Sequence, residues 1–135
     1  MILITGIPNA GKTTYSSQFE NVIHFDGVRG RDRRDKIVAA VEQDNSICVE
    51  GVYAKARERK RLVEASKAKN TCIWLNMPLD MCVYRESTGR KRSEHLVQVA
   101  YEDFEPPTYD EGWDEIIEIK EVPYVEGISD KRKTG

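Results

Sequence analysis

The sequence predicts an α/β domain of three layers, in which a parallel sheet of about five strands is covered by helices on both faces. Short apolar runs alternate along the chain with segments whose apolar residues recur at helical spacing. Strands that are apolar throughout are typical of a parallel sheet buried on both sides. The first apolar run also leads directly into a glycine-rich turn and then a lysine, which favours the same fold class.

Strands and helices alternate through the first half of the chain. We expect a strand at 2–5, before the glycine-rich turn, and a helix over 12–19 after it. A second strand follows at 22–25. Apolar residues at helical spacing then predict a helix over 31–43, and a short apolar run predicts a buried strand at 46–49.

The second half of the chain continues the alternation. Residues 54–68 are strongly charged but keep apolar positions on one side, which predicts a helix, and 71–75 is the next apolar strand. Pro78 opens a further helix at a position where its missing N–H does no harm. Helical spacing predicts another helix over 96–104, and 115–119 forms the last strand.

A single domain fits the size of the chain. Its 135 residues are enough for one core, which we expect over residues 1–125, with a flexible tail at 126–135. No apolar stretch approaches the roughly 20 residues needed to span a bilayer. The N-terminus lacks the basic flank and cleavage site of a signal peptide. We therefore expect a cytoplasmic protein that does not contact membranes, and its oligomeric state stays open.

The cysteines and histidines do not show the spacing of metal ligands. Cys48 and Cys72 lie in apolar strand-like runs and Cys82 lies on a predicted helix, so we expect small buried side chains. His24 and His95 are isolated in the sequence, and each is expected to be structural or exposed.

Charge is distributed unevenly along the chain. Residues 1–100 carry 17 basic and 12 acidic side chains, whereas residues 101–135 carry 4 basic and 11 acidic ones. The first segment could offer a basic surface to a phosphate-rich partner. The alternative is two ordinary solvated faces, and charge alone does not decide between them.

The turn after the first strand has the pattern of a phosphate-binding loop. Residues 6–13 fit G-x-x-x-x-G-K-[ST], which aims backbone N–H groups at one point and so holds a polyphosphate. Lys12 is expected to reach the β- and γ-phosphates and Thr13 to bind Mg²⁺. The sequence therefore predicts a P-loop fold that uses ATP, or another NTP, with Mg²⁺. The expected nucleotide contacts are Gly6, Asn9, Ala10, Gly11, Lys12, Thr13 and Thr14.

Two carboxylates follow the second and third predicted strands. Ligands of parallel sheets bind beyond the carboxyl ends of the strands, which singles out Asp26 and Glu50. Asp26 is expected to take a proton from an incoming hydroxyl, while Arg29 grips a neighbouring substrate phosphate. Glu50 is the better candidate for Mg²⁺. Either carboxylate could instead be a helix N-cap or a turn residue.

A basic cluster lies between the last two predicted helices. It comprises Arg85, Arg90, Lys91 and Arg92. A mobile basic loop near 85–93 is what a kinase lid needs, because it can close over the nucleotide and neutralise charge on the transferring phosphoryl group. The alternative is a connecting turn whose basic side chains extend over apolar surface.

With these residues in place, the chain resembles the kinase domain of polynucleotide 5′-hydroxyl kinases, both the bacteriophage type and the mammalian repair enzyme. The likeness runs over residues 2–119. Residues 26–29, Asp-Gly-Val-Arg, match the D-x-x-R of that family. Residues 104–113 look like the F-E-x-P-T-x-x-E-G-aromatic segment that closes the mammalian-type domain and is also common in small phage P-loop proteins.

The resemblance implies a role for several residues. Asp26 would be the general base, Arg29 would contact substrate phosphate, and Arg85 would support the nucleotide. Arg90 would be the lid arginine, with Arg92 as second choice. The implied reaction moves the γ-phosphate of ATP to a hydroxyl, most simply the 5′-OH end of a nucleic acid. Two alternatives stay open: a kinase for a small molecule or nucleotide, and a nucleotide-binding interaction module with little or no turnover.

Overall fold

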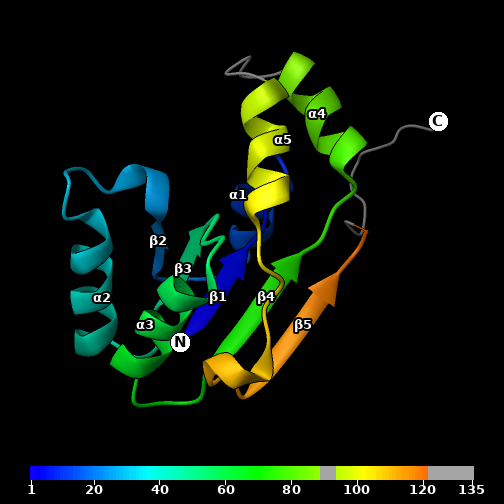
Figure 1. Cartoon of the computed structure of the whole chain (residues 1–135). Coiled ribbons are helices and arrows are strands. Elements are labelled where there is room, and N and C mark those ends of the chain that lie inside the picture. The colour runs from blue at the N-terminus through cyan, green and yellow to red at the C-terminus, as the bar shows by residue number, and fades with distance from the viewer. Residues whose placement is uncertain (89–93, 122–135) are drawn as a thin grey trace.

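The computed structural model describes residues 1–88 and 94–121 and confirms the three-layer α/β prediction (Figure 1). All five strands run parallel in one sheet, in the order β2-β3-β1-β4-β5. The strands are β1 (Ile2–Thr5), β2 (Val22–His24), β3 (Cys48–Gly51), β4 (Thr71–Leu75) and β5 (Glu115–Ile119). The predicted ranges of the first, fourth and fifth strands are those of the structure.

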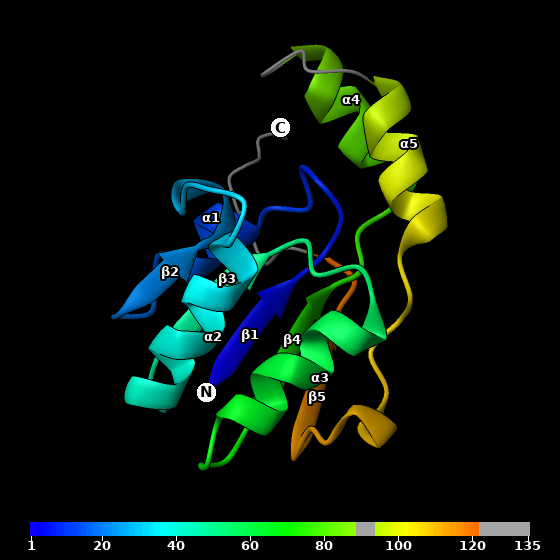
Figure 2. The same cartoon turned by 60° about the vertical axis from the view of Figure 1, so that its left-hand side comes forward.

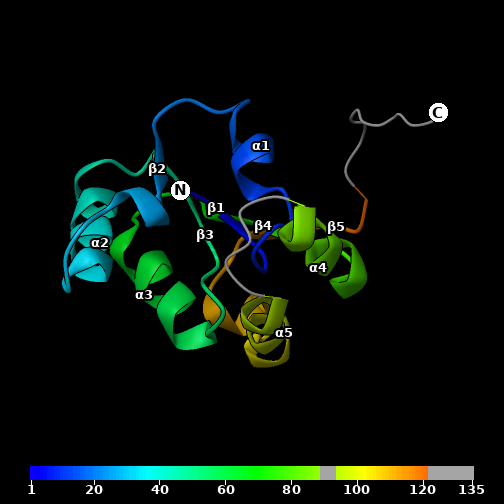
Figure 3. The ribbon, with the colours of Figure 1, turned by 90° about the horizontal axis from the view of Figure 1, so that it is seen from above.

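Some helices flank the sheet, and others extend beyond the carboxyl ends of its strands. Seen from above, α1 lies on one side of the sheet and α2 and α3 lie on the other (Figure 3). Helices α4 and α5 form a hairpin past the strand tips (Figures 1 and 2). The helices are α1 (Lys12–Ser16), α2 (Arg33–Gln43), α3 (Ala56–Ala65), α4 (Leu79–Thr88) and α5 (Glu94–Asp103), with 3₁₀ turns at Phe25–Gly27 and Tyr109–Glu111.

The sheet separates two apolar clusters because successive side chains of a strand point to opposite faces. Leu3 of β1 packs with Ile37 of α2 and Leu62 of α3 on one face. Its neighbour Ile4 packs on the other face with Cys82 of α4 and Val97 of α5. Both faces of the central strand are thus buried, as its continuous apolar sequence predicts.

Several helices are shorter than predicted. Helix α1 ends at Ser16 rather than at Phe19, because the chain continues in turns: the N–H of Ser17 donates to Thr14 and the N–H of Phe19 donates to Ser16. Helices α2 and α3 likewise begin after the predicted first residues, at Arg33 and Ala56. The residues that flank these helices suit a helix by composition, but they have no apolar side that packs on the sheet. The sequence pattern therefore does not show where each helix begins or ends.

A buried ion pair fastens the segment after α5 to α3. Arg59 has no exposed surface, and its Nε and Nη2 donate to the two carboxylate oxygens of Glu111, each at 2.8 Å. Its Nη1 donates to the carbonyl of Tyr53, and the Trp113 indole donates to Glu111 Oε1 at 2.9 Å. The 104–113 segment thus closes the fold through a fully hydrogen-bonded charge pair.

The cysteines are buried, as the sequence predicts. Burial raises the pKa of the Cys48 thiol to about 11 and that of Cys72 to about 12, and it also raises the pKa of Cys82. Thiolates, which are the reactive form, are therefore scarce near neutral pH. We expect an aromatic disulfide reagent at pH 8 to leave the native protein unmodified and to titrate three thiols after unfolding in urea. Rapid labelling of the native protein would contradict this burial.

Two sequence predictions fall outside the described residues. Arg90 and Arg92 belong to residues 89–93, and the tail at 126–135 belongs to residues 122–135. The proposed roles of both arginines therefore stay predictions. Within the described ranges, no helix combines the length and apolar character needed to cross a membrane.

Candidate nucleotide site

The phosphate loop is held in a shape that its glycines permit. A Cβ on Gly6 would lie 2.8 Å from the carbonyl oxygen of Leu75, so only glycine lets β4 approach the loop this closely. Gly11, directly before α1, has a φ of 97°, in the left-handed region that favours glycine. The Lys12 ammonium folds back and donates to the carbonyl of Ile7 at 2.8 Å. The Lys12 ammonium therefore lies against the backbone of the phosphate loop.

Helix α4 supports the tip of the phosphate loop. Asn9, with a φ of 68°, donates from Nδ2 to Glu86 Oε1 at 2.8 Å and to the carbonyl of Cys82 at 3.2 Å. In return, Arg85 Nη1 donates to the carbonyl of Asn9 at 2.8 Å. The arginine predicted to support the nucleotide therefore contacts the loop itself. The Asn9–Glu86 contact has no signal in the sequence, because it joins residues far apart in the chain.

Lys12 is mostly buried and provides a direct test of the loop. Lys12→Met keeps a chain of similar shape but removes the charge that would meet the phosphates. We expect weaker ATP binding by calorimetry and a loss of transfer of about 10²–10³-fold, as for other preorganised charge-stabilising donors. Lys67→Met, at an exposed position, is the matched control and should change neither quantity.

Glu50 lies on the strand between β2 and β1 and is largely buried. Its register partners are Ile4 on one side and His24 on the other. His24 Nδ1 lies 2.5 Å from Glu50 Oε1, so the histidine that is isolated in the sequence is paired in the fold. The pair fixes the direction of one carboxylate oxygen. Glu50 Oε2 has no hydrogen-bond partner among the described residues.

The donor set fits a magnesium ion that arrives with a nucleotide. Mg²⁺ in such sites takes one or two protein oxygens and fills its shell with phosphate oxygens and water. Thr13 lies in the first turn of α1, where its side chain is exposed, and Glu50 offers a carboxylate oxygen. Within residues 1–88 and 94–121, no group of three or more His, Cys, Asp or Glu residues could hold a metal by itself.

Asp26 lies in the 3₁₀ turn directly after β2. It is exposed, and its carboxylate makes no hydrogen bond or ion pair with any described residue. His24, and not Asp26, occupies the N-cap of that turn. Arg29 is also exposed; its carbonyl accepts a hydrogen bond from Lys36, and its guanidinium has no partner among residues 1–88 and 94–121.

The strand order brings the predicted site residues to one edge of the sheet. Asp26 follows β2, Glu50 lies at the end of β3, and the phosphate loop follows β1, and these three strands are neighbours. Adjacent strands lie about 4.8 Å apart. Asp26, Glu50 and the phosphate loop therefore share the carboxyl edge of the sheet.

Comparison with known proteins supports this geometry at the level of the fold. No family model matches the chain, and no curated protein matches it in sequence. Solved structures do match. A sugar kinase from Janibacter sp. HTCC2649 has a TM-score of 0.71 at 14% identity, covering 87% of this chain and 83% of its own. The chain has the P-loop kinase fold.

Two further kinases have the same fold. A gluconokinase from Sinorhizobium meliloti 1021 has a TM-score of 0.63 at 15% identity over 88% of this chain and 81% of its own. The shikimate kinase from Acinetobacter baumannii, solved with shikimate, has a TM-score of 0.57 at 17% identity over 89% of this chain and 83% of its own. These similarities are structural, and none of the three structures is described as a polynucleotide kinase.

Proposed function

We propose that the protein transfers the γ-phosphate of ATP, or of another NTP, to a hydroxyl group of a small molecule. The observation that carries this proposal is the juxtaposition of Asp26 and Glu50 with the phosphate loop at one sheet edge. The three structural neighbours named above are kinases of small molecules by their descriptions, which supports this acceptor class over a polynucleotide.

The transfer follows from the placement of the chain's own residues. The acceptor oxygen attacks the γ-phosphorus as the bond to the β-phosphate oxygen breaks, and the nucleoside diphosphate leaves. The Asp26 carboxylate takes the proton of the attacking hydroxyl. Lys12 and the loop amides offset the charge that moves onto the β-phosphate, and Mg²⁺, held by Thr13 and Glu50, would neutralise the phosphates further.

A polynucleotide 5′-OH is the second candidate acceptor. It is favoured by the exposed guanidinium of Arg29, which has no described partner and lies in the same turn region as Asp26. Such a side chain can hold the phosphate next to a terminal hydroxyl. Arg90, outside the described residues, would stabilise the transferring group in either case.

One assay separates the candidate functions. The protein would be incubated with Mg²⁺ and γ-labelled ATP, and offered sugars, sugar acids, nucleosides, nucleotides or 5′-OH oligonucleotides, with one sample lacking any acceptor. We expect label in small acceptors. Label only in oligonucleotides would favour the second candidate. No label in any acceptor, with ATP binding intact, would instead favour an interaction module.

A further inference from the structure

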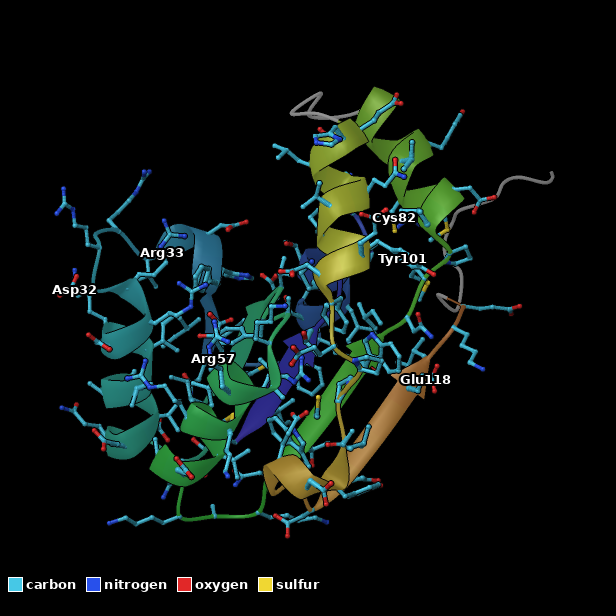
Figure 4. The ribbon with its side chains drawn as sticks, in the orientation of Figure 1. Asp32, Arg33, Arg57, Cys82, Tyr101 and Glu118 are labelled. Carbon is cyan, nitrogen blue, oxygen red and sulfur yellow. The ribbon has the colours of Figure 1, made fainter. Side chains whose placement is uncertain are left out.

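The side chain of Glu50 points to the face of the sheet that α1 covers. Successive side chains of a strand point to opposite faces. On β3, Cys48 packs in the apolar cluster that holds Cys82 of α4 (Figure 4) and that Tyr15 of α1 borders. Val49 packs in the cluster on the other face. Glu50 therefore lies on the same side as Cys48, toward the helix that begins directly after the phosphate loop and contacts β3.

His24 approaches Glu50 from the neighbouring strand on that same face. Val22 of β2 borders the cluster on the α1 side and Ile23 borders the other cluster, so alternation directs His24 to the α1 side. His24 is also the register partner of Glu50. The Nδ1 of its imidazole lies 2.5 Å from Glu50 Oε1. The pair thus joins the ends of β2 and β3 on the side of the sheet that α1 covers.

The hydrogen bond of this pair runs from the histidine to the glutamate. An ionised carboxylate only accepts hydrogen bonds, so the Nδ1 that faces it carries the hydrogen. The side chain of Glu50 is 9% exposed and that of His24 is 45% exposed. The imidazole thus reaches from the surface to a mostly buried carboxylate and holds its Oε1 atom.

The second carboxylate oxygen of Glu50 stays available. Oε2 has no hydrogen-bond partner among residues 1–88 and 94–121. In these ranges the fully buried side-chain atoms without a partner are Tyr53 Oη and Asn70 Oδ1, so Glu50 Oε2 retains contact with solvent. A carboxylate that is held at one oxygen and open at the other suits a metal ligand, because outer hydrogen bonds orient ligating carboxylates.

Magnesium makes this orientation matter. Mg²⁺ requires near-ideal octahedral geometry and is held in such sites by one or two protein side chains, with phosphate oxygens and water completing its shell. Thr13 and Glu50 are the expected pair here. A carboxylate that rotates freely must be ordered when the ion arrives, and this ordering weakens binding.

We infer that His24 is a positioning residue for Mg²⁺: its Nδ1–H holds Oε1 of Glu50 and so keeps Oε2 available to the ion that accompanies the nucleotide. The inference rests on the proposed phosphotransferase function, which requires that ion, and it adds a residue outside the phosphate-loop motif. His24 acts through Glu50 and does not bind the ion itself. Its backbone also caps the 3₁₀ turn that carries Asp26, and a side-chain substitution leaves that cap in place.

Calorimetry tests this role without turnover. The dissociation constant of a non-hydrolysable ATP analogue would be measured for the full chain in saturating Mg²⁺ and in EDTA; the ratio of the two constants is the Mg²⁺ effect. We expect His24→Ala to weaken binding in Mg²⁺ on the order of tenfold and to leave binding in EDTA unchanged. A role limited to tying β2 to β3 would lower stability in urea but would keep the Mg²⁺ effect.

Two conservative variants test the donor atom itself. His24→Asn places an amide N–H where the imidazole has Nδ1, and it should keep most of the Mg²⁺ effect. His24→Gln places its amide N–H where the imidazole has Nε2, and it should lose as much as His24→Ala. The matched control is Ser46→Ala, which removes an exposed hydrogen bond to Asp44 at the opposite end of β3. This control should change neither dissociation constant.

A double variant tests whether His24 acts through Glu50. Glu50→Gln should reduce the Mg²⁺ effect by itself, and the addition of His24→Ala should then weaken binding no further, because coupled residues do not contribute additively. A full Mg²⁺ effect in His24→Ala or in Glu50→Gln would overturn the inference. Losses that simply add in the double variant would overturn it as well.

The proposed function has a separate outcome. If the His24 and Glu50 variants bind as expected but the unmodified protein transfers phosphate to no acceptor, the proposed function alone is wrong. If the unmodified protein transfers phosphate and His24→Ala keeps the full Mg²⁺ effect, this inference alone is wrong.

Discussion

Asp26→Asn is expected to lower phosphate transfer by about 10²–10⁴-fold, the usual contribution of a general base. The asparagine keeps the size and polarity of the side chain but cannot accept a proton from the attacking hydroxyl. Because Asp26 is exposed and makes no bond with another described side chain, the fold loses nothing. ATP affinity, measured by calorimetry, should therefore stay at the level of the unmodified protein while the turnover rate falls.

Asp32→Asn is the matched control for this change. Asp32 is exposed, lies a short distance along the chain, and pairs only weakly with Lys36, at 3.5 Å. The control should keep full transfer activity. Transfer that survives in Asp26→Asn would show that another group accepts the proton, and Glu50 would then be the next carboxylate to replace.

Glu111→Gln is expected to destabilise the fold by about 3–5 kcal/mol, the usual cost of removing one partner of a buried charge pair. Arg59 is fully buried, so the variant leaves its guanidinium without a counter-charge and without room for water. Urea unfolding monitored by circular dichroism measures the loss. The destabilisation is large compared with the total stability of a typical domain, about 5–15 kcal/mol.

Two controls separate burial from charge. Asp103→Asn removes the carboxylate that pairs with Lys55 at 2.7 Å, but this pair lies at the surface and should cost about 0–1 kcal/mol. The double variant Arg59→Met with Glu111→Leu removes both charges and should recover most of the stability lost in Glu111→Gln. A single variant as stable as the unmodified protein would contradict a structural role for this pair.

The same pair predicts how stability depends on pH. Burial alone would raise the pKa of Glu111, but the hydrogen bonds from Arg59 and Trp113 outweigh it and the pKa lies below its ordinary value of 4.5. A carboxyl group with a lowered pKa contributes stability that is present above its unfolded-state value and is lost as the pH falls through its native value. When the free energy of unfolding is measured at decreasing pH, starting from pH 6, it should therefore decrease once the pH is lower than 4.5. In Glu111→Gln this part of the decline should be missing.

The sequence was sufficient for the fold because short, mostly apolar strands alternate along the chain with segments whose apolar residues recur at helical spacing. It was also sufficient for the phosphate loop, whose pattern is local, and for placing Asp26 after a strand. Strand order is a different matter. Nothing local shows that β3 lies between β2 and β1, so the contact of His24 with Glu50 could not be predicted.

Long-range contacts limited the rest of the prediction. Arg59 lies in a helix rich in charged residues, and composition does not distinguish it from its exposed neighbours Arg57 and Arg61. Its burial depends on Glu111, which is far along the chain. A pocket at the carboxyl end of β4 is likewise lined by Ile7, Trp74 and Phe104, which come from three separate segments. Periodicity detects which face of an element is apolar, but not which elements meet.

The Arg59–Glu111 pair also bears on the order of events during translation. Arg59 is made 52 residues before its partner. A nascent chain that ends before Glu111 has no counter-charge for the guanidinium, and β4 lacks its neighbour β5. If α3 packed in its native position at that stage, the Arg59 guanidinium would be buried without a counter-charge. We therefore expect the domain to reach its native packing only after the segment carrying Glu111 has left the ribosome.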